Sequence, residues 1–149
     1  RLEFARLKAL HAADAEPIAA AVVAQALADP EALTGLRFRW HPSLSVLESP
    51  HAVVALWAAH QTDGEIASVA IDQAEQAVVL RDELDVLVLP VDPGSACFAA
   101  RTLAGEPFGV AASAAGSLHP GFDLGATMSL LLRHHALVAL HRPVAISLC

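Results

Sequence analysis

The stretch AVVLRDELDVLVL, residues Ala77–Leu89, decides the fold, because two apolar runs lie on either side of a short polar link. Both runs, Ala77–Leu80 and Val86–Leu89, are rich in Val and Leu, and Val in particular favours extended backbone. The link around Arg81–Glu83 is short enough for a tight turn. The pattern therefore predicts an antiparallel β-hairpin.

The residues after the hairpin predict three short helices and a final strand. Asp92-Pro93 places a capping carboxylate before a proline that suits the first helical turn. Asp123 is a second candidate cap, and the helix after it carries an apolar stripe that includes Met128 and Leu131. The predicted elements are helices at Gly94–Leu103, Gly109–Ser117 and Leu124–His134, and a strand at Ala136–Leu140.

The residues before the hairpin predict helices first and strands later. Leu36–Leu47 alternates apolar and polar residues, as a half-buried strand does, and Pro42 predicts a break within it. Ser49-Pro50 repeats the cap-and-proline pattern and predicts a helix that continues to His60, with Trp57 facing inward. The other predicted elements are helices at Leu2–His11, Ile18–Ala28 and Pro30–Leu33, and a weak strand or irregular loop at Glu65–Ile71.

This order of elements predicts an α+β fold in which a small antiparallel sheet packs against three helices. The closest physical match is a winged-helix-like module, and we expect residues 36–149 to form it. We expect residues 1–35 to form a helical linker that continues from a missing N-terminal domain, because the chain begins at Arg1 inside an apparent helix.

Composition and charge limit the classes of function. The chain has 149 residues, 55% of them apolar, and a net charge of −7 from nine Lys and Arg and sixteen Asp and Glu. The negative charge disfavours nucleic-acid binding, and the high apolar content excludes a disordered chain. The segment Thr62–Asp92 holds eight acids and one base, so it carries the whole net charge. We interpret it as a solvated face or, alternatively, as an acidic surface for a basic partner.

Neither a membrane anchor nor a disulfide framework is predicted. No apolar run approaches the ~18–20 residues of a membrane span, and no signal peptide is visible. The two cysteines, Cys97 and Cys149, fit reduced thiols in a cytoplasmic protein, with a bridge between them as the alternative. We expect Cys97 to be a buried, inert thiol rather than a nucleophile, because the apolar residues after it are typical of a core.

The sequence contains no pattern of a catalytic, metal or cofactor site. The eight histidines lack an H-x-x-x-H spacing, and adjacent helical residues such as His134 and His135 point about 100° apart. The glycines match no phosphate-binding loop, and no nucleophile elbow is present. We therefore expect a protein that is not an enzyme and uses no cofactor. Asp82 and Glu83 are expected to lie ionised in a solvated turn.

Four segments of the chain carry a family resemblance. They are RLEFAR (Arg1–Arg6), LRFRWHPSL (Leu36–Leu44), VVLR (Val78–Arg81) and FDL (Phe122–Leu124), the last followed by a leucine run at Leu130–Leu132. Together they resemble the C-terminal half of the HvfC/BufC family, and His41–Leu44 is the most specific part. The resemblance covers nearly the whole chain and implies a domain similar to precursor-peptide-recognition modules. His135 departs from it, because Gly is expected after the third helix.

The resemblance implies a non-catalytic accessory protein of bacterial natural-product biosynthesis. Such a protein would hold a small precursor peptide and dock a multinuclear-iron oxidative enzyme that modifies cysteines of that peptide. An edge strand would bond the peptide backbone, and pockets between strand and helix would select its side chains. The predicted peptide-binding residues are Val86, Val88, Thr127, Leu131 and His134, and the predicted partner-docking residues are Asp82, Glu83, Asp85 and Trp57.

Two other functions remain open. The domain could be a scaffold that docks the enzyme through its acidic hairpin and the Trp57 helix without touching the peptide. It could also be a DNA-binding regulator, although the helix in the recognition position offers only Thr127, Ser129 and Arg133 to base edges. The hairpin in the position of a wing is acidic, which disfavours that role.

Overall fold

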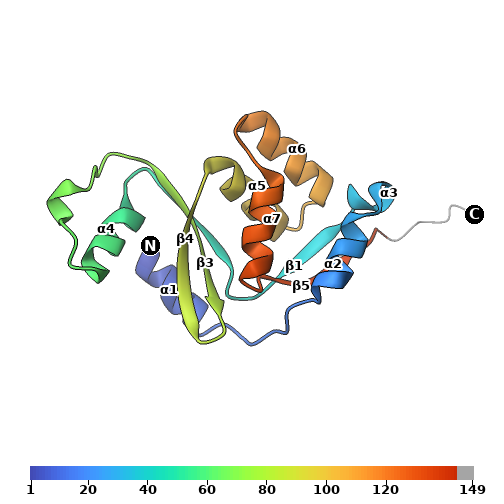
Figure 1. Ribbon diagram of the computed structural model, residues 1–149, viewed down its shortest axis with the longest axis horizontal. Coiled ribbons are helices and arrows are strands. Elements are labelled where there is room, and N and C mark those ends of the chain that lie inside the picture. Colours follow the sequence, from blue (N-terminus) through green and yellow to red (C-terminus); the bar gives the residue numbers. More distant parts are fainter. Residues whose placement is uncertain (144–149) are drawn as a thin grey trace, which may run out of the picture.

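The predicted β-hairpin belongs to the larger of two sheets. β3 (Glu75–Asp82) and β4 (Asp85–Val91) pair antiparallel, and Glu83 and Leu84 form the turn between them. β2 (Ser45–Ser49) pairs with the other side of β3, so the order of the three strands is β2-β3-β4. The computed structural model describes residues 1–143 and has an α+β fold, as expected (Figure 1). Cys149, and with it the alternative of a bridge to Cys97, lies outside the described residues.

A second, two-stranded sheet is formed by β1 (Arg37–Trp40) and β5 (Leu137–His141). The strand predicted over Leu36–Leu47 therefore divides, and its two halves join different sheets. The division lies at Pro42, as the proline predicts, and the Leu44 N–H donates to the His41 carbonyl at 2.9 Å to close a turn there. The winged-helix arrangement itself stays a prediction.

The helices agree with the predicted ranges closely after the hairpin and less closely before it. The Asp92 side chain caps the first helix after the hairpin by accepting the Ser95 N–H at 3.0 Å, and Asp123 caps the third by accepting the Ala126 N–H at 2.9 Å. Within residues 1–143, no helix has both the length and the apolar character needed to cross a membrane. The described α-helices are α1 (Leu2–Leu10), α2 (Ala20–Leu27), α3 (Pro30–Leu33), α4 (Val53–Gln61), α5 (Pro93–Leu103), α6 (Phe108–Leu118) and α7 (Leu124–Arg133).

The start of α4 and the loop after it differ from the prediction. Ser49 ends β2 instead of capping α4, and its hydroxyl accepts the His51 N–H at 3.1 Å. The cap comes from a distant residue: the Glu75 carboxylate on β3 accepts the N–H groups of Val54 at 2.6 Å and Ala55 at 3.1 Å. The helix therefore begins where the sheet supplies an anion to its N-terminus. The region predicted as a weak strand or loop, 65–71, is a loop with one 3-10 turn, η1 (Ile66–Ser68).

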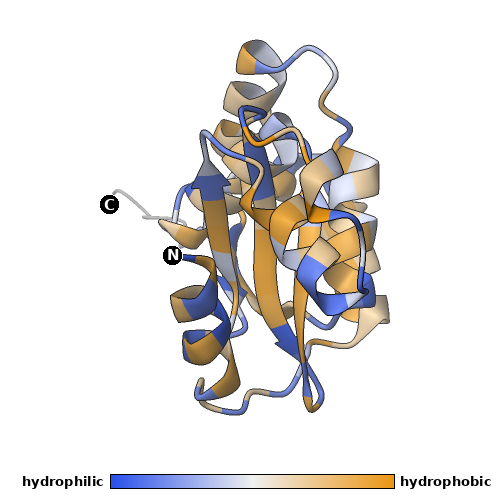
Figure 2. Ribbon diagram, turned by 90° about the vertical axis from the view of Figure 1, so that its left-hand side faces the viewer, coloured by the Kyte–Doolittle hydropathy of each residue, from blue (hydrophilic) through white to orange (hydrophobic). Residues whose placement is uncertain are grey.

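Helices cover both faces of the three-stranded sheet. On one face, α1 and α4 pack against a buried cluster that includes Ala77 and Val79 of β3. On the other face, α5, α6 and α7 contribute to a larger cluster around Val78 and Leu80. Successive residues of β3 thus alternate between the two clusters, as the pleat requires. Figure 2 shows that the strands are largely hydrophobic between polar ends.

Residues 1–35, which the sequence suggests as a linker, share both buried clusters with the rest of the chain. Leu2 and Ala9 of α1 are buried against the sheet, and Val23 and Ala26 of α2 belong to the larger cluster. The helix predicted from Ile18 starts at Ala20, because the Ile18 N–H donates to the Leu137 carbonyl of β5 at 2.9 Å. Buried contacts therefore cross residue 35.

The end of α7 keeps the left-handed backbone that glycine usually provides, although the residue there is His135, with φ of 55°. The His135 N–H donates to the Leu132 carbonyl at 3.1 Å, and the Ala136 N–H donates to the Leu131 carbonyl at 3.0 Å. These two bonds form a Schellman motif. His135 therefore occupies a left-handed position that favours Gly, and His, like Asn and Asp, is found there more often than other residues.

Candidate functional site

The free edge of β4 is the first candidate for a functional surface. In a hairpin with a two-residue turn, Asp82 and Asp85 form a hydrogen-bonded pair, and the pairs alternate from there. Val86 and Val88 then lie in non-hydrogen-bonded pairs, so their N–H and C=O groups point away from β3. Two observations agree with this assignment. The Arg81 N–H, opposite Val86, donates to Ser43 on the β2 side and not to Val86. Pro90, which has no N–H to donate to β3, follows Val88 by two residues and so lies in the same kind of pair.

Beside this edge lies a groove between β4 and α1, with a volume of about 390 Å³. Its rim combines charged side chains with three exposed leucines, because Leu7 is 54% exposed, Leu10 is 48% exposed and Leu84 is 90% exposed. The sheet carries no further strand next to β4 within residues 1–143. The groove is lined by Glu3, Arg6, Leu7, Leu10, Leu84, Asp85 and Val86.

The five predicted peptide-binding residues do not line one groove. Val86 and Val88 point to the α1 face of the sheet, where they pack against the smaller cluster. Thr127 and Leu131 lie buried in or beside the larger cluster on the opposite face. The Thr127 hydroxyl donates to the Asp123 carbonyl at 2.8 Å and lies 2.7 Å from the Ser95 hydroxyl, so it joins α7 to α5. The helix that flanks the Val86 and Val88 side chains is therefore α1, not α7.

His134, the fifth predicted residue, belongs to a cluster at the turn end of the hairpin. Its Nδ1 lies 3.0 Å from one carboxylate oxygen of Asp82, and the Nδ1 of His135 lies 2.8 Å from the other. Burial alone would raise the pKa of Asp82, but hydrogen bonds from His135 and His134 and their charges outweigh burial and lower it. The expectation that Asp82 lies in a solvated turn is therefore wrong. We call this arrangement the Asp82–His134–His135 cluster.

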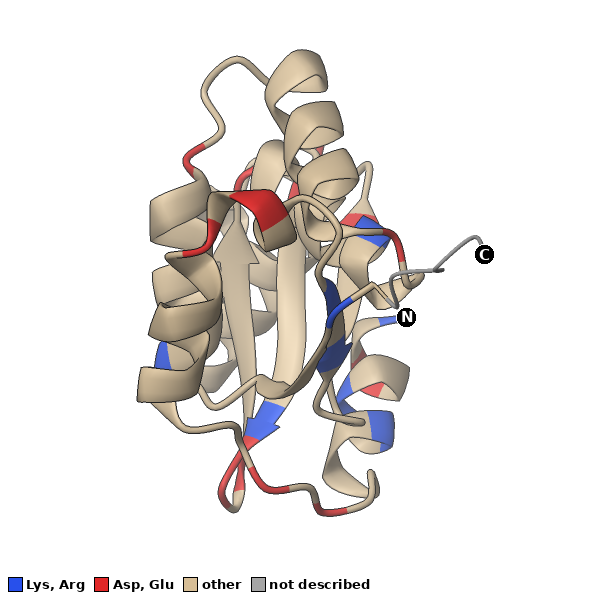
Figure 3. Cartoon of the chain, turned by 90° about the vertical axis from the view of Figure 1, so that its right-hand side faces the viewer, with Lys and Arg blue, Asp and Glu red and all other residues tan. Residues whose placement is uncertain are grey.

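The acidic segment 62–92 is divided by the fold. Glu75, Asp82 and Asp92 are used inside the molecule as helix caps or as the acceptor for the two histidines. Glu83 and Asp85 are exposed at the tip of the hairpin, where Figure 3 shows acidic residues on the tip and on the neighbouring loop. The remaining acids of the segment, Asp63, Glu65 and Asp72, are exposed in the loop between α4 and β3.

The four predicted docking residues do not form one patch. Glu83 and Asp85 are exposed, whereas Asp82 is engaged by the histidines. Trp57 lies on α4, whose N-terminus is bound at Glu75, the end of β3 away from the turn. Its ring is half-buried and stacks with the Arg6 guanidinium at 4.9 Å. Trp57 is therefore mainly a packing residue between α4 and α1.

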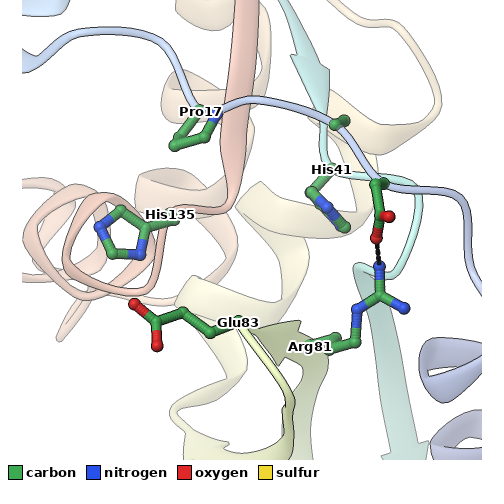
Figure 4. Close-up of a pocket in the computed structure, with 7 residues that line it drawn as sticks. Pro17, His41, Arg81, Glu83 and His135 are labelled. Carbon is green, nitrogen blue, oxygen red and sulfur yellow. Dashed lines mark hydrogen bonds and ion pairs between the residues drawn. The ribbon is translucent and has the colours of Figure 1, made fainter.

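A cavity of about 360 Å³ lies near the hairpin turn, and one of its lining residues, His41, has no predicted binding role. His41 is only 8% exposed, and its Nδ1 lies 2.7 Å from the Ser43 hydroxyl and accepts the Ser43 N–H at 3.2 Å. Burial and the charge of Arg81 lower the pKa of His41, although Asp14 opposes them. Figure 4 shows His135 and Glu83 on one side of the cavity, and His41 and Arg81 on the other.

Two further predictions concern the Cys97 thiol and the absence of a metal site. Cys97 is half-buried on α5 rather than fully buried. Among residues 1–143, no three His, Cys, Asp or Glu side chains are grouped so that they could hold a metal ion.

The sequence matches no protein-family model, and comparisons with curated proteins and with solved structures find no match.

Proposed function

We propose that this chain is a non-catalytic accessory module that binds an extended peptide by adding it as a strand to β4. This is the role that the HvfC/BufC resemblance implies, with a cytoplasmic precursor peptide as the ligand and an oxidative iron enzyme as the partner. The observation that carries the proposal is the free edge of β4, where the backbone groups of Val86 and Val88 face outward beside a groove lined by exposed leucines and charged side chains.

The edge also indicates which peptides it accepts. A strand added to β4 would place alternate side chains over the α1 face, where Leu7, Leu10 and Leu84 leave apolar surface exposed. Near the turn, Glu83 and Asp85 favour a basic residue in the peptide. The ligand is therefore an extended segment with apolar residues at every second position and a Lys or Arg at one end.

The expected affinity is modest. Four backbone hydrogen bonds contribute about 1 kcal/mol each, and an apolar side chain that becomes buried contributes about 1.5–3 kcal/mol. The loss of freedom on association offsets about 4–15 kcal/mol of this gain. Because the gain and the loss are of similar size, we expect a dissociation constant no tighter than the micromolar range.

The test removes the outward-facing N–H of Val88. Val88→Pro removes this N–H without removing a bond to β3, because Val88 lies in a non-hydrogen-bonded pair, and Val88→Ala is the matched control that loses the same side-chain packing. The probe is a fluorescein-labelled decapeptide in which Val alternates with Thr and which ends in Lys. We expect Val88→Pro to weaken binding roughly tenfold or more, and Val88→Ala to weaken it much less.

Hydrogen exchange provides a second readout for the same peptide. Binding should slow exchange of the Val86 and Val88 amides, which have no strand partner in the free chain. Unchanged exchange at both amides, or equal affinity of the Pro and Ala variants, would exclude strand addition at β4. Peptide binding lost in both variants with the fold intact would assign the site to the α1 groove alone.

The two alternatives have weaker support. For the scaffold, separate binding assays with an enzyme and with a peptide remain the discriminating measurement. For DNA binding, α7 would have to present base contacts, yet Thr127 is buried and bonded inside the chain. The hairpin tip near α7 also carries Glu83 and Asp85, which repel phosphate.

A further inference from the structure

The three-stranded sheet has a second free edge, along β2, and two residues turn their backbone groups outward there. On β3, the Arg81 N–H donates to Ser43, just before β2, so every second residue of β3 counted from Arg81 bonds to β2. Val46 and Glu48 lie opposite the intervening residues of β3. Their N–H and C=O groups therefore point away from β3, on a side where no described strand pairs with β2.

A groove of about 750 Å³ lies beside this edge and is lined from both faces of the sheet. Phe4, on one side of the groove, belongs to α1, and Ala100, on the other, belongs to α5. These two helices contribute to the clusters on opposite faces of the sheet. A groove that touches both helices and residues Ser45–Glu48 of β2 must lie at the edge of the sheet, where an added strand would continue it.

The α1 side of this groove is basic. Arg1 and Lys8 line it, are exposed, and form no ion pair with any residue of the described chain. Phe4 lines the same side and is 72% exposed. The acid of the groove, Glu48, points to the α5 face, because it alternates with Leu47, which is buried in the cluster under α1. An added strand would therefore meet two positive charges and an aromatic ring on one face, and a carboxylate on the other.

The two basic residues lie toward opposite ends of β2. Arg1 lines a further cavity together with Ser49, the last residue of β2. Near the other end, the carbonyl of Leu10, two residues after Lys8, accepts a hydrogen bond from the Arg81 side chain. Lys8 follows Arg1 by seven residues, which is about 10 Å along a helix, and strand residues four positions apart are separated by about 13 Å. Lys and Arg side chains are long enough to cover this difference.

We propose that the β2 edge binds an extended acidic segment of a partner protein, in which two acids four positions apart flank an apolar residue. The segment would bond to the outward backbone groups of Val46 and Glu48. On the α1 face, its acids would meet Lys8 and Arg1, and the apolar residue between them would contact Phe4. The intervening residues would lie on the face of Glu48, which disfavours acids there. The chain would then hold two extended segments of opposite charge preference, one at each edge of the same sheet.

The test compares two fluorescein-labelled heptapeptides by fluorescence anisotropy with the full chain. In the first peptide, Thr alternates with Asp, Val and Asp; in the second, both Asp residues are replaced by Lys. We expect the basic peptide to bind roughly tenfold more weakly than the acidic one, because two ion pairs are replaced by two repulsions. Equal binding of the two peptides, or no binding of the acidic peptide at millimolar protein concentration, would overturn the proposal.

Two pairs of variants locate the bound peptide. Glu48→Pro removes an outward N–H without removing a bond to β3, and Glu48→Ala is the matched control that loses the same carboxylate. Lys8→Glu reverses a charge in the groove, and Arg133→Glu reverses an exposed charge on α7. We expect the acidic peptide to bind roughly tenfold more weakly to the Pro variant than to its Ala control, and to Lys8→Glu than to Arg133→Glu. Equal affinity within either pair would contradict the proposed site.

Hydrogen exchange of the unmodified chain is a readout that needs no variant. The acidic peptide should slow exchange of the Val46 and Glu48 amides and leave the Val88 amide unchanged. If the Val46 and Glu48 amides become protected as the chain is concentrated without peptide, the occupant of the edge is a second copy of the chain, and the proposal is wrong. Val88→Pro should leave binding at β2 unchanged, and Glu48→Pro should leave binding at β4 unchanged, so the two proposals fail separately.

Discussion

Replacing Asp82 by Asn should destabilise the fold by about 1.5 kcal/mol at neutral pH. The carboxylate accepts from two imidazoles, at 3.0 and 2.8 Å, and bonds to a charged group contribute about 1.5–3 kcal/mol each. The lower end applies here, because the His135 side chain is 55% exposed and solvent screens the charge. Asn offers one acceptor in place of two, so one imidazole N–H loses its partner. For a chain of this size, the melting temperature should fall by about 3–6 °C.

The pH dependence of this difference identifies its cause. The folded-state pKa of Asp82 is lowered, because hydrogen bonds and charges of His135 and His134 outweigh the effect of burial. Its contribution is therefore fully present above the ordinary Asp value of about 3.9, and is lost as pH falls through the lower folded value. Thermal melts of wild type and Asp82→Asn should differ near neutral pH and converge in acid. Asp72→Asn, at an exposed loop position, is the control and should change little. A difference that persists at the lowest pH would refute the assignment.

Three further changes test the packing and the buried polar groups. Gly109→Ala should lower the free energy of unfolding, measured in urea, by about 1–3 kcal/mol, because the new Cβ would lie 2.9 Å from a backbone carbon after α3. In the same helix, a Cβ at Gly116 meets nothing, so Gly116→Ala should raise the free energy of unfolding by about 0.5–1 kcal/mol. Thr102→Val should lower the free energy of unfolding by about 1–3 kcal/mol, because the buried Trp40 indole N–H, which donates to the Thr102 hydroxyl at 3.0 Å, would lose its acceptor. Thr102→Ser keeps the hydroxyl and should retain most of the stability. The pKa of His41 is lowered by burial and by a neighbouring charge, so wild type should lose stability relative to His41→Asn as pH falls below about 6.5, and an NMR titration showing an ordinary ring pKa would contradict this.

Local signals explain which elements could be predicted. The hairpin follows from two apolar runs around a short link, and α5 and α7 follow from Asp92 and Asp123, each of which caps a helix within three residues of itself. These patterns need no knowledge of the rest of the chain. Ser49 gave the same local signal and was wrong, because its strand pairs with β3 and the cap of α4 is supplied by Glu75, 21 residues from Val54.

The site depends on partners that no local pattern identifies. Alternation places Val86 and Val88 on one face of β4, but it does not say whether α1 or α7 covers that face. Asp82 meets His134 and His135 across 52 and 53 residues, and nothing in their spacing indicates this contact. The sequence shows only that His135 stands where the resemblance expects Gly, and its positive φ belongs to the helix end itself, so this departure does not indicate the contact with Asp82.

The same contacts explain why the free edge of β4 is ready to accept a strand. Glu75 binds the N-terminus of α4 at one end of β3, and Asp82 binds the end of α7 at the other. Between them, Arg81 donates to the Leu10 carbonyl at 3.0 Å and so fixes α1 over the sheet. The hairpin is therefore held at both ends and on one face, while the outer side of β4 carries no strand among residues 1–143. Because the protein side is ordered before binding, only the peptide must lose freedom when it is added, and this limits the cost of association.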